Sequence, residues 1–177
     1  MNEFPMTVAP VPEQTLYSIA FPVLYEAQIA QMANCTPMAL KEFRNGETLI
    51  AVGDCAFRFF VVRTGEIEIL DYSDEVPRTI TVHGKGEFTG DISHLTGTPA
   101  IFGAIARGWC EVLEISEVAL RHVLNQCPVL GDTILQAFIA RSQLLRESPD
   151  FVGLRVIGSR YSQDTFRISW HLVARVG

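Results

Sequence analysis

The residues whose chemistry stands out form one glycine-punctuated segment, Gly86-Glu87-Phe88-Thr89-Gly90-Asp91-Ile92-Ser93-His94-Leu95. A short helix that begins after Gly90 would direct its first backbone N–H groups, from about Ile92 to Leu95, toward an anion. Glycine at position 90 lets the backbone approach a ligand closely, and Gly97 ends the turn. The segment therefore predicts a site that binds an anionic group.

No catalytic pattern accompanies this segment. The sequence shows no Ser-His-Asp set, paired carboxylates or metal-ligand spacing. Its four cysteines form no C-x-x-C pair and complete no zinc site with the histidines; they are Cys35, Cys55, Cys110 and Cys127. We therefore expect a protein that is not an enzyme, with no catalytic residue, no metal and no cofactor beyond a small anionic ligand. The cysteines are expected to be reduced thiols that pack as small hydrophobes.

Composition fits one globular domain. The chain has 177 residues, of which 48% are hydrophobic and 19% charged, and its net charge is −6. An acidic domain of this kind is a poor binder of nucleic acid, which requires clustered lysines and arginines. No apolar stretch is long enough to span a membrane, and the N-terminus has no basic start followed by an apolar run. We expect a cytoplasmic protein with neither a nucleic-acid nor a membrane partner.

The elements that must position this segment can be predicted from the pattern of apolar residues and turn signals, which changes along the chain. Residues 1–15 hold three prolines and predict an extended lead-in, and residues 16–33 have a helical pattern that Thr36-Pro37 breaks. From about residue 40 to 115, short apolar and alternating runs are separated by turn signals such as Thr64-Gly65. This spacing predicts an antiparallel roll or sandwich, interrupted by the short helix near residues 91–96.

Two helices follow the predicted strands. Ser116 is positioned to cap a helix through Leu124, with Glu117 in its first turn. Pro128 divides this helix from a longer one with a broad apolar face made by Ile134, Leu135, Phe138, Ile139, Leu144 and Leu145. The resulting organisation is a lead-in at 1–15, one domain at 16–147 and a tail at 148–177. The fold class is mainly β with flanking helices.

Four segments of the β-region stand in a characteristic order: Gly46-Glu47-Thr48-Leu49-Ile50 with Gly53-Asp54, Phe60-Val61-Val62-Arg63-Thr64-Gly65-Glu66-Ile67-Glu68-Ile69, the segment 86–95, and Cys110-Glu111-Val112-Leu113-Glu114-Ile115. Together they resemble the cyclic-nucleotide-binding domain of the catabolite-activator and kinase-regulatory class. The first two look like its opening hairpins, the third like its phosphate-binding cassette and the fourth like its closing strand. The resemblance covers roughly residues 20–147 and implies a β-roll that senses a small anionic ligand, of which a cyclic nucleotide such as cAMP is the family's example.

The resemblance also implies which residues line the ligand site: Phe88, Gly90, Asp91, Ile92, Ser93, His94, Ala100, Ile101 and Phe102. In the family, an acidic residue after the cassette glycine accepts a hydrogen bond from the ribose, and Asp91 occupies that position. An alternative role for Asp91, of equal weight, is to satisfy the N-terminus of the short helix.

One position departs from the family pattern. The family places a phosphate-pairing arginine where this chain has Ala100, in Pro99-Ala100-Ile101-Phe102. Bidentate pairing of arginine with phosphate is strong, and a cation elsewhere does not reproduce its geometry. Arg107 would face away from Ala100 on a regular strand, and Lys85 and His94 remain as candidate partners of an anion. We therefore expect weak or altered nucleotide binding.

The tail carries a second resemblance. Residues 152–168 are similar to the segment that follows the sensor in bacterial two-part proteins that join a cyclic-nucleotide-binding domain to a thioredoxin-reductase-like domain. The chain has neither the G-x-G-x-x-G fingerprint nor the redox C-x-x-C of such a reductase. The alternatives are a self-standing sensor and the sensor part of an FAD- and NADPH-dependent oxidoreductase. A transcription regulator without its DNA-binding domain fits less well.

Two protein partners follow from these resemblances. In the family, the long C-terminal helix forms a dimer seam, so the helix at 130–147 predicts a homodimer through Ile134, Phe138 and Leu145. The alternative is that this helix packs only on its own β-roll. A reductase domain or protein is the second expected partner.

Overall fold

The computed structural model describes residues 15–91 and 95–147. The described residues up to Leu144 belong to one compact unit. The lead-in before Thr15 and the tail after Glu147 lie outside the described residues, so the expectations for them are not tested. Within the described part, no helix is both long and apolar enough to cross a membrane.

Two short helices precede the strands, α1 (Leu16–Ala20) and α2 (Glu26–Cys35). The expectation of one helix over 16–33 is wrong, because Phe21 precedes Pro22 and leaves the helical region with φ −125° and ψ 61°. The start of α2 is fixed by Gln28, whose Oε1 accepts the Tyr25 N–H at 2.9 Å. Its end falls at Thr36-Pro37, as the sequence indicates.

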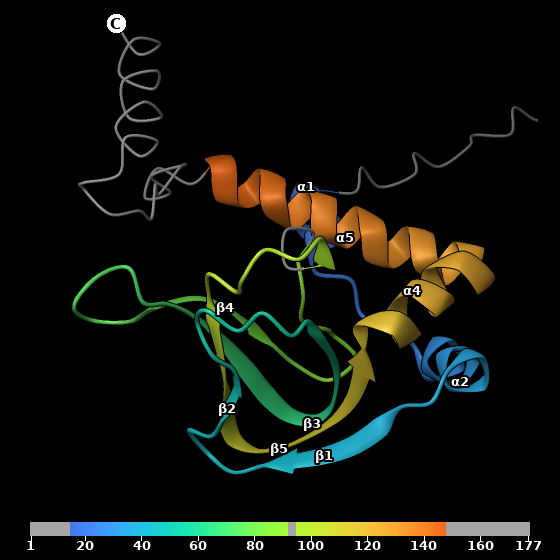
Figure 1. The fold of residues 1–177 in the computed structure, drawn as a ribbon, viewed down its shortest axis with the longest axis horizontal. Helices are drawn as coiled ribbons and strands as arrows, with labels where there is room; N and C mark the ends of the chain where they lie inside the picture. The colour runs from blue at the N-terminus through green and yellow to red at the C-terminus, as the bar shows by residue number, and fades with distance from the viewer. Residues whose placement is uncertain (1–14, 92–94, 148–177) are drawn as a thin grey trace, which may run out of the picture. The chain divides into compact units, whose positions relative to one another are not determined.

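Five strands make one antiparallel sheet: β1 (Ala39–Phe43), β2 (Thr48–Ile50), β3 (Arg58–Asp71), β4 (Arg78–His83) and β5 (Gly103–Ser116). The strand order is β1-β5-β3-β4, and β2 also pairs with β5. The two long strands β3 and β5 pair along most of their length and curl together, as Figure 1 shows. The antiparallel β-roll expected for this region is confirmed.

The strands differ from the expectation at Thr64-Gly65 and in the pairing of β1 and β2. Thr64-Gly65 does not form a turn between two strands, because β3 runs through it with shifts of register on both sides. Gly65 has φ +77°, and a Cβ there would collide with the Trp109 carbonyl oxygen on β5. A glycine-permitted bulge therefore bends one strand where the sequence suggests a hairpin. Likewise, β1 and β2 do not form an opening hairpin, since each pairs with β5.

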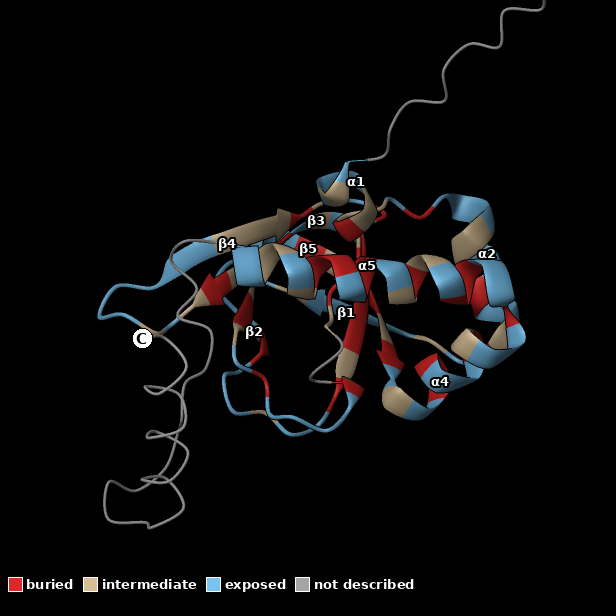
Figure 2. Cartoon of the chain, turned by 90° about the horizontal axis from the view of Figure 1, so that it is seen from above, coloured by how far each residue is buried: buried red, intermediate tan, exposed pale blue. Residues whose placement is uncertain are grey.

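Helices α4 (Glu117–Gln126) and α5 (Pro128–Glu147) follow β5 directly. The Ser116 hydroxyl accepts the Ala119 N–H at 3.3 Å and begins α4 as expected. In Figure 2, α5 crosses over the strands while α2 and α4 lie together near one of its ends. The helices thus cover one side of the roll.

Two buried clusters result. The helix-side cluster joins the helices to one face of the strands and contains Leu24, Met32, Phe57, Phe59, Val61, Phe88, Leu95, Leu113, Ile115, Ala119, Leu120, Val123, Cys127, Leu130, Ile134, Ala137 and Phe138. The roll-side cluster fills the other face and contains Leu49, Ile50, Phe60, Val62, Ile67, Ala100, Ala104, Ala106, Cys110 and Val112. Successive residues of β3, such as Phe59 and Phe60, alternate between the two clusters because strand side chains alternate in direction.

The faces of α5 correct the expected dimer seam. Ile134 and Phe138 are fully buried in the helix-side cluster of their own chain. Ile139, which the sequence grouped with them, is 52% exposed. A seam made of Ile134 and Phe138 is therefore wrong, because these side chains already pack on the roll.

The cysteines divide into two kinds. The fold brings the sulfurs of Cys35, at the end of α2, and Cys127, between α4 and α5, next to one another, although the two residues are 92 positions apart in sequence. Cys55 is a free exposed thiol and Cys110 is a free buried one. The sequence analysis did not anticipate the pairing of Cys35 with Cys127, which are too far apart in sequence for any spacing rule to indicate it.

Candidate ligand-binding site

The first half of the cassette is held against β3 by backbone hydrogen bonds. The Thr89 N–H donates to the Phe60 carbonyl at 2.9 Å, and the Thr89 hydroxyl oxygen accepts the Phe60 N–H at 3.1 Å. Glu87 and Gly86 make equivalent backbone contacts with Val62, each at 2.9 Å. The segment before Gly90 therefore behaves as an additional strand and fixes where the cassette starts.

Gly90 is required by the protein's own packing. Its φ is +113°, and a Cβ there would lie 2.9 Å from Cζ of Phe138. Beyond it, Asp91 is partly buried, and its carbonyl accepts the Leu95 N–H at 3.2 Å, as in a helical turn. Ile92, Ser93 and His94, which the sequence places at the anion site, lie outside the described residues.

Ala100 occupies a different setting from the cassette. It is 7% exposed and belongs to the roll-side cluster, whereas Phe88 belongs to the helix-side cluster. Its N–H donates to the Asp54 carbonyl at 2.8 Å, and its carbonyl accepts the Gly53 N–H at 2.7 Å. Of the residues that follow, Phe102 is partly buried and Ile101 is 47% exposed.

The cations considered for the anion site pair with carboxylates on other elements. Lys85 Nζ lies 3.6 Å from Oε1 of Glu26 on α2, and both side chains are largely exposed. Arg107 Nη1 lies 3.6 Å from Oε2 of Glu66 on the neighbouring strand. Ala104 and Ala106 are buried while Arg107 is exposed, so the expected alternation after Ala100 holds on β5.

The sequence analysis missed a buried arginine that contacts the cassette, Arg141 of α5. Its side chain is buried, with 6% of the residue exposed. Nη2 donates to the Phe88 carbonyl at 2.9 Å, Nη1 to the Gly90 carbonyl at 2.8 Å and Nε to the Ala20 carbonyl at 2.8 Å. One guanidinium thus joins α5, the end of α1 and the start of the cassette.

A signal for Arg141 was present in the sequence. The buried positions of α5 recur at Ile134, Ala137, Phe138 and Arg141, which is the spacing of one helical face. An arginine on that face must satisfy its donors inside the fold. Burial lowers the pKa of Arg141 to about 10, and the nearby Glu87 and Asp91 carboxylates act in the opposite direction, so it stays protonated at neutral pH.

A second buried ionisable group lies beside this arginine. His83 is 2% exposed, and its Nδ1, 4.0 Å from Oε2 of Glu87, has no hydrogen-bond partner. Burial lowers the pKa of His83 to about 3, and the positive charge of Arg141 adds to this effect. Glu87 instead accepts the Gly84 N–H at 2.7 Å. His83 is therefore neutral across the physiological range.

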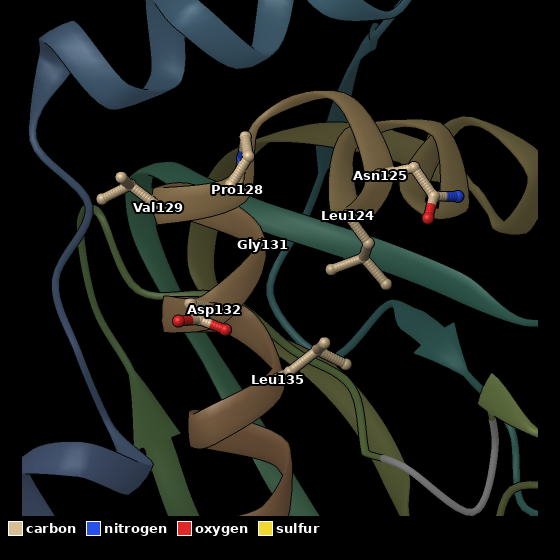
Figure 3. Close-up of a pocket in the computed structure, with 7 residues that line it drawn as sticks. All are labelled: Leu124, Asn125, Pro128, Val129, Gly131, Asp132 and Leu135. Atoms are coloured by element: carbon tan, nitrogen blue, oxygen red, sulfur yellow. The ribbon is translucent and has the colours of Figure 1, made fainter.

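A hollow of about 340 Å³ lies at the corner between α4 and α5. Figure 3 shows its lining: Leu124, Asn125, Pro128, Val129, Gly131, Asp132 and Leu135. None of the residues expected to bind a ligand is among them. Around the described residues, no cluster of metal-ligating side chains occurs.

Several known proteins share this arrangement of strands and helices. The family model described as "Cyclic nucleotide-binding domain" matches residues 40–127. The Thermus thermophilus catabolite activator protein is similar over 72% of this chain, with 19% identity and a TM-score of 0.58. This chain covers 59% of that protein.

Two further solved structures share the fold. A cyclic nucleotide-binding domain from Methylobacillus flagellatus is similar over 79% of this chain and 81% of its own, with 21% identity and a TM-score of 0.56. Oxidised CprK in complex with o-chlorophenolacetic acid is similar over 66% of this chain and 48% of its own, with 16% identity and a TM-score of 0.53. At identities this low, the structural similarity establishes a common fold and nothing further.

Proposed function

The chain carries, over residues 40–127, a domain of the cyclic nucleotide-binding family, and from this premise we propose that it is a non-catalytic module that senses a small anionic ligand. The family match is the observation that carries the proposal. The domain extends over residues 16–147, from the helices before the roll to the end of α5. The predicted cassette, residues 86–95, is the proposed ligand site.

Nucleotide binding by this site is weak. The position of the family's phosphate-pairing arginine is taken by Ala100, in an apolar cluster, while Lys85 and Arg107 pair with carboxylates elsewhere. Losing one partner of a buried charged contact costs about 2–5 kcal/mol. Helix-terminal N–H groups supply only about 1 kcal/mol in return. Affinity for cAMP should therefore be at least about tenfold below that of a family member with the arginine.

The test is the pair of variants Ala100→Arg and Ala100→Met, studied by calorimetry with cAMP and cGMP. Without ligand, both should be less stable than wild type because Ala100 is buried, and Ala100→Arg more so because its charge is unpaired. With ligand, only Ala100→Arg should gain affinity and recover stability. Tight cAMP binding by the wild-type protein would contradict the proposed loss.

Asp91 supplies a second readout on the same site. If it accepts a hydrogen bond from the ribose, Asp91→Ala should weaken cAMP binding to the Ala100→Arg variant. If it only serves the first turn of the cassette, the substitution should lower stability without a separate loss of affinity. Comparing the two losses decides between these roles.

A ligand of different chemistry is the first alternative outcome. The solved CprK complex holds an aromatic carboxylate in the same fold, and the roll-side cluster here is apolar. An aromatic carboxylate therefore belongs in the same calorimetric panel as the nucleotides. A gain of thermal stability with it, and none with cAMP, would redefine the ligand class.

The oxidoreductase alternative rests on the tail resemblance, which lies outside the described residues. If the module serves a thioredoxin-reductase-like protein, it should bind that reductase and alter its turnover of NADPH. The chain itself should contain no flavin. A yellow purified protein with flavin absorbance would overturn the non-catalytic assignment.

A further inference from the structure

Arg141 joins three separate backbone positions through one buried side chain. Three of its donors reach backbone carbonyls, those of Ala20, Phe88 and Gly90, at 2.8–2.9 Å. Its guanidinium carbon also lies 4.8 Å from the centre of the Phe88 ring and 5.9 Å from that of Phe138. The planar fork of arginine can satisfy several carbonyls at once, which the point charge of a lysine cannot do in the same geometry.

The two carbonyls on the cassette fix the direction of the peptide groups that contain them. In a trans peptide the C=O and the N–H point in opposite directions. The Phe88 carbonyl points to Arg141, and the N–H of the same peptide, that of Thr89, donates to Phe60 of β3. By the same geometry, the Gly90 carbonyl held by Arg141 directs the Asp91 N–H away from α5. Arg141 thus sets the orientation of the peptide that opens the predicted anion-binding turn.

A second arginine holds the far end of the cassette. Arg121 of α4 donates from Nη2 to the Leu95 carbonyl at 2.8 Å and lies 3.0 Å from Glu117 on its own helix. This side chain is about half exposed, whereas Arg141 is buried. The two helices after the roll therefore each hold one end of the cassette through a backbone carbonyl.

We propose that Arg141 is a positioning residue for the ligand site, which holds the Phe88 and Gly90 carbonyls and so fixes the orientation of the Gly90–Asp91 peptide at the start of the cassette. The role in ligand binding rests on the proposed function, and the control of cassette geometry does not.

The experiment compares Arg141→Met, Arg141→Lys and Leu130→Ala. Arg141→Met keeps length and loses charge and donors, while Arg141→Lys keeps the charge and loses the fork. Leu130→Ala is the matched control, because Leu130 is buried on the same helix and truncating it lowers stability without removing a cassette hydrogen bond. Amide hydrogen exchange of the unliganded proteins is measured for residues 86–91, and global stability is measured by urea unfolding.

Relative to Leu130→Ala at equal global stability, Arg141→Met should speed exchange over 86–91 by about tenfold or more, as expected for the loss of charge-assisted hydrogen bonds. Arg141→Lys should fall between Arg141→Met and wild type. Exchange over 86–91 that rises no more than in Leu130→Ala would overturn the inference.

Calorimetry with cAMP then separates the inference from the proposed function. Where wild type binds cAMP, Arg141→Met should weaken binding by more than Leu130→Ala does, and equal weakening would refute the ligand role. Where wild type binds no cAMP, the nucleotide form of the proposed function fails, while the exchange result still decides whether Arg141 sets the cassette.

Discussion

The helix-side and roll-side clusters are both buried and both made of apolar side chains, yet only the helix-side cluster has a buried charge beside it. Against the helix-side cluster lies a buried guanidinium, that of Arg141, with its aromatic neighbours Phe88 and Phe138. The roll-side cluster, where the family pattern places an arginine, holds three small alanines at 100, 104 and 106. Positive charge therefore approaches the cassette through its backbone carbonyls from α5, and Ala100 supplies none.

This difference suggests why the start of the cassette, residues 86–91, can be held in place without an arginine at position 100. Shape depends on the strand-like contacts of Thr89 with Phe60 and on the carbonyl contacts of Arg141. In the proposed function, recognition of the ligand's charge depends on a separate position, that of Ala100. The two properties reside in different clusters, so substitutions should separate them.

The largest expected effect is on the helix-side cluster. Phe138 is fully buried and packs edge-on against Phe59 and Phe88, with ring centres 6.2 Å apart in each case. Phe138→Ala should lower the free energy of unfolding by about 3–5 kcal/mol. Ile139→Ala, at the exposed neighbouring position, should change it by less than about 0.5 kcal/mol. Similar losses in urea unfolding of both variants would contradict the placement of these two faces.

The next effect concerns the glycine that α5 approaches. Gly90→Ala forces φ +113° on an alanine and drives its Cβ toward the Phe138 ring, so stability should fall by more than the roughly 1–3 kcal/mol of backbone strain alone. Gly97→Ala is the matched control, because φ there is +93° and no atom lies within 4 Å of the added Cβ. Equal thermal destabilisation of the two variants would show that close packing against α5 adds nothing.

Acidification should reveal the neutral histidine beside Arg141. The folded-state pKa of His83 is about 3, below the ordinary value of 6.5, so below pH 6.5 the unfolded chain takes up a proton that the folded chain refuses. The free energy of unfolding should therefore drop by about 2 kcal/mol between pH 7 and pH 5 from this group. His83→Phe should remove that part of the pH dependence. If the free energy of unfolding of His83→Phe, measured with urea, fell between pH 7 and pH 5 as steeply as that of wild type, this role of His83 would be contradicted.

Thiol reactivity offers a smaller but direct contrast between the clusters. Without reductant, the native protein should show one accessible thiol, that of Cys55. Unfolding should add only Cys110, whose pKa is raised by burial in the roll-side cluster, because we expect the adjacent sulfurs of Cys35 and Cys127 to be oxidised to a disulfide in the absence of reductant. Four reactive thiols in denaturant without reductant would show that this pair is reduced.

The smallest effect on stability is expected at the exposed face of α5. We propose that a homodimer, if it uses this helix, forms through Ile139 and Val129, which are 52% and 78% exposed, rather than through the buried Ile134. Ile139→Asp should then give a monomer in sedimentation at high micromolar concentration, and its urea unfolding should match that of wild type only at concentrations where wild type is also a monomer. A wild-type protein that sediments as a monomer would remove the dimer altogether.

Much of this fold could be predicted from the pattern of residue types over short stretches of sequence. Alternation and turn signals predicted the antiparallel roll, Ser116 and Pro128 marked the starts of α4 and α5, and Thr36-Pro37 marked the end of α2. These features depend on the residue types of a short stretch, so the sequence alone could determine them. The loss of phosphate pairing at Ala100, which the family pattern indicates, stays a prediction.

Other features were decided only by tertiary structure. The residues Thr64-Gly65 have the composition of a turn, and only the close approach of β5 shows that they form a bulge within one strand. Cys35 and Cys127 are brought together only by the fold. Arg141 stood on a readable helical face, but its carbonyl partners lie 51, 53 and 121 positions away in sequence. Local propensity acts over a few residues, whereas these contacts exist only once the roll has closed and α5 has packed against it. That distinction is why the sequence determined the elements and the fold determined what holds the cassette.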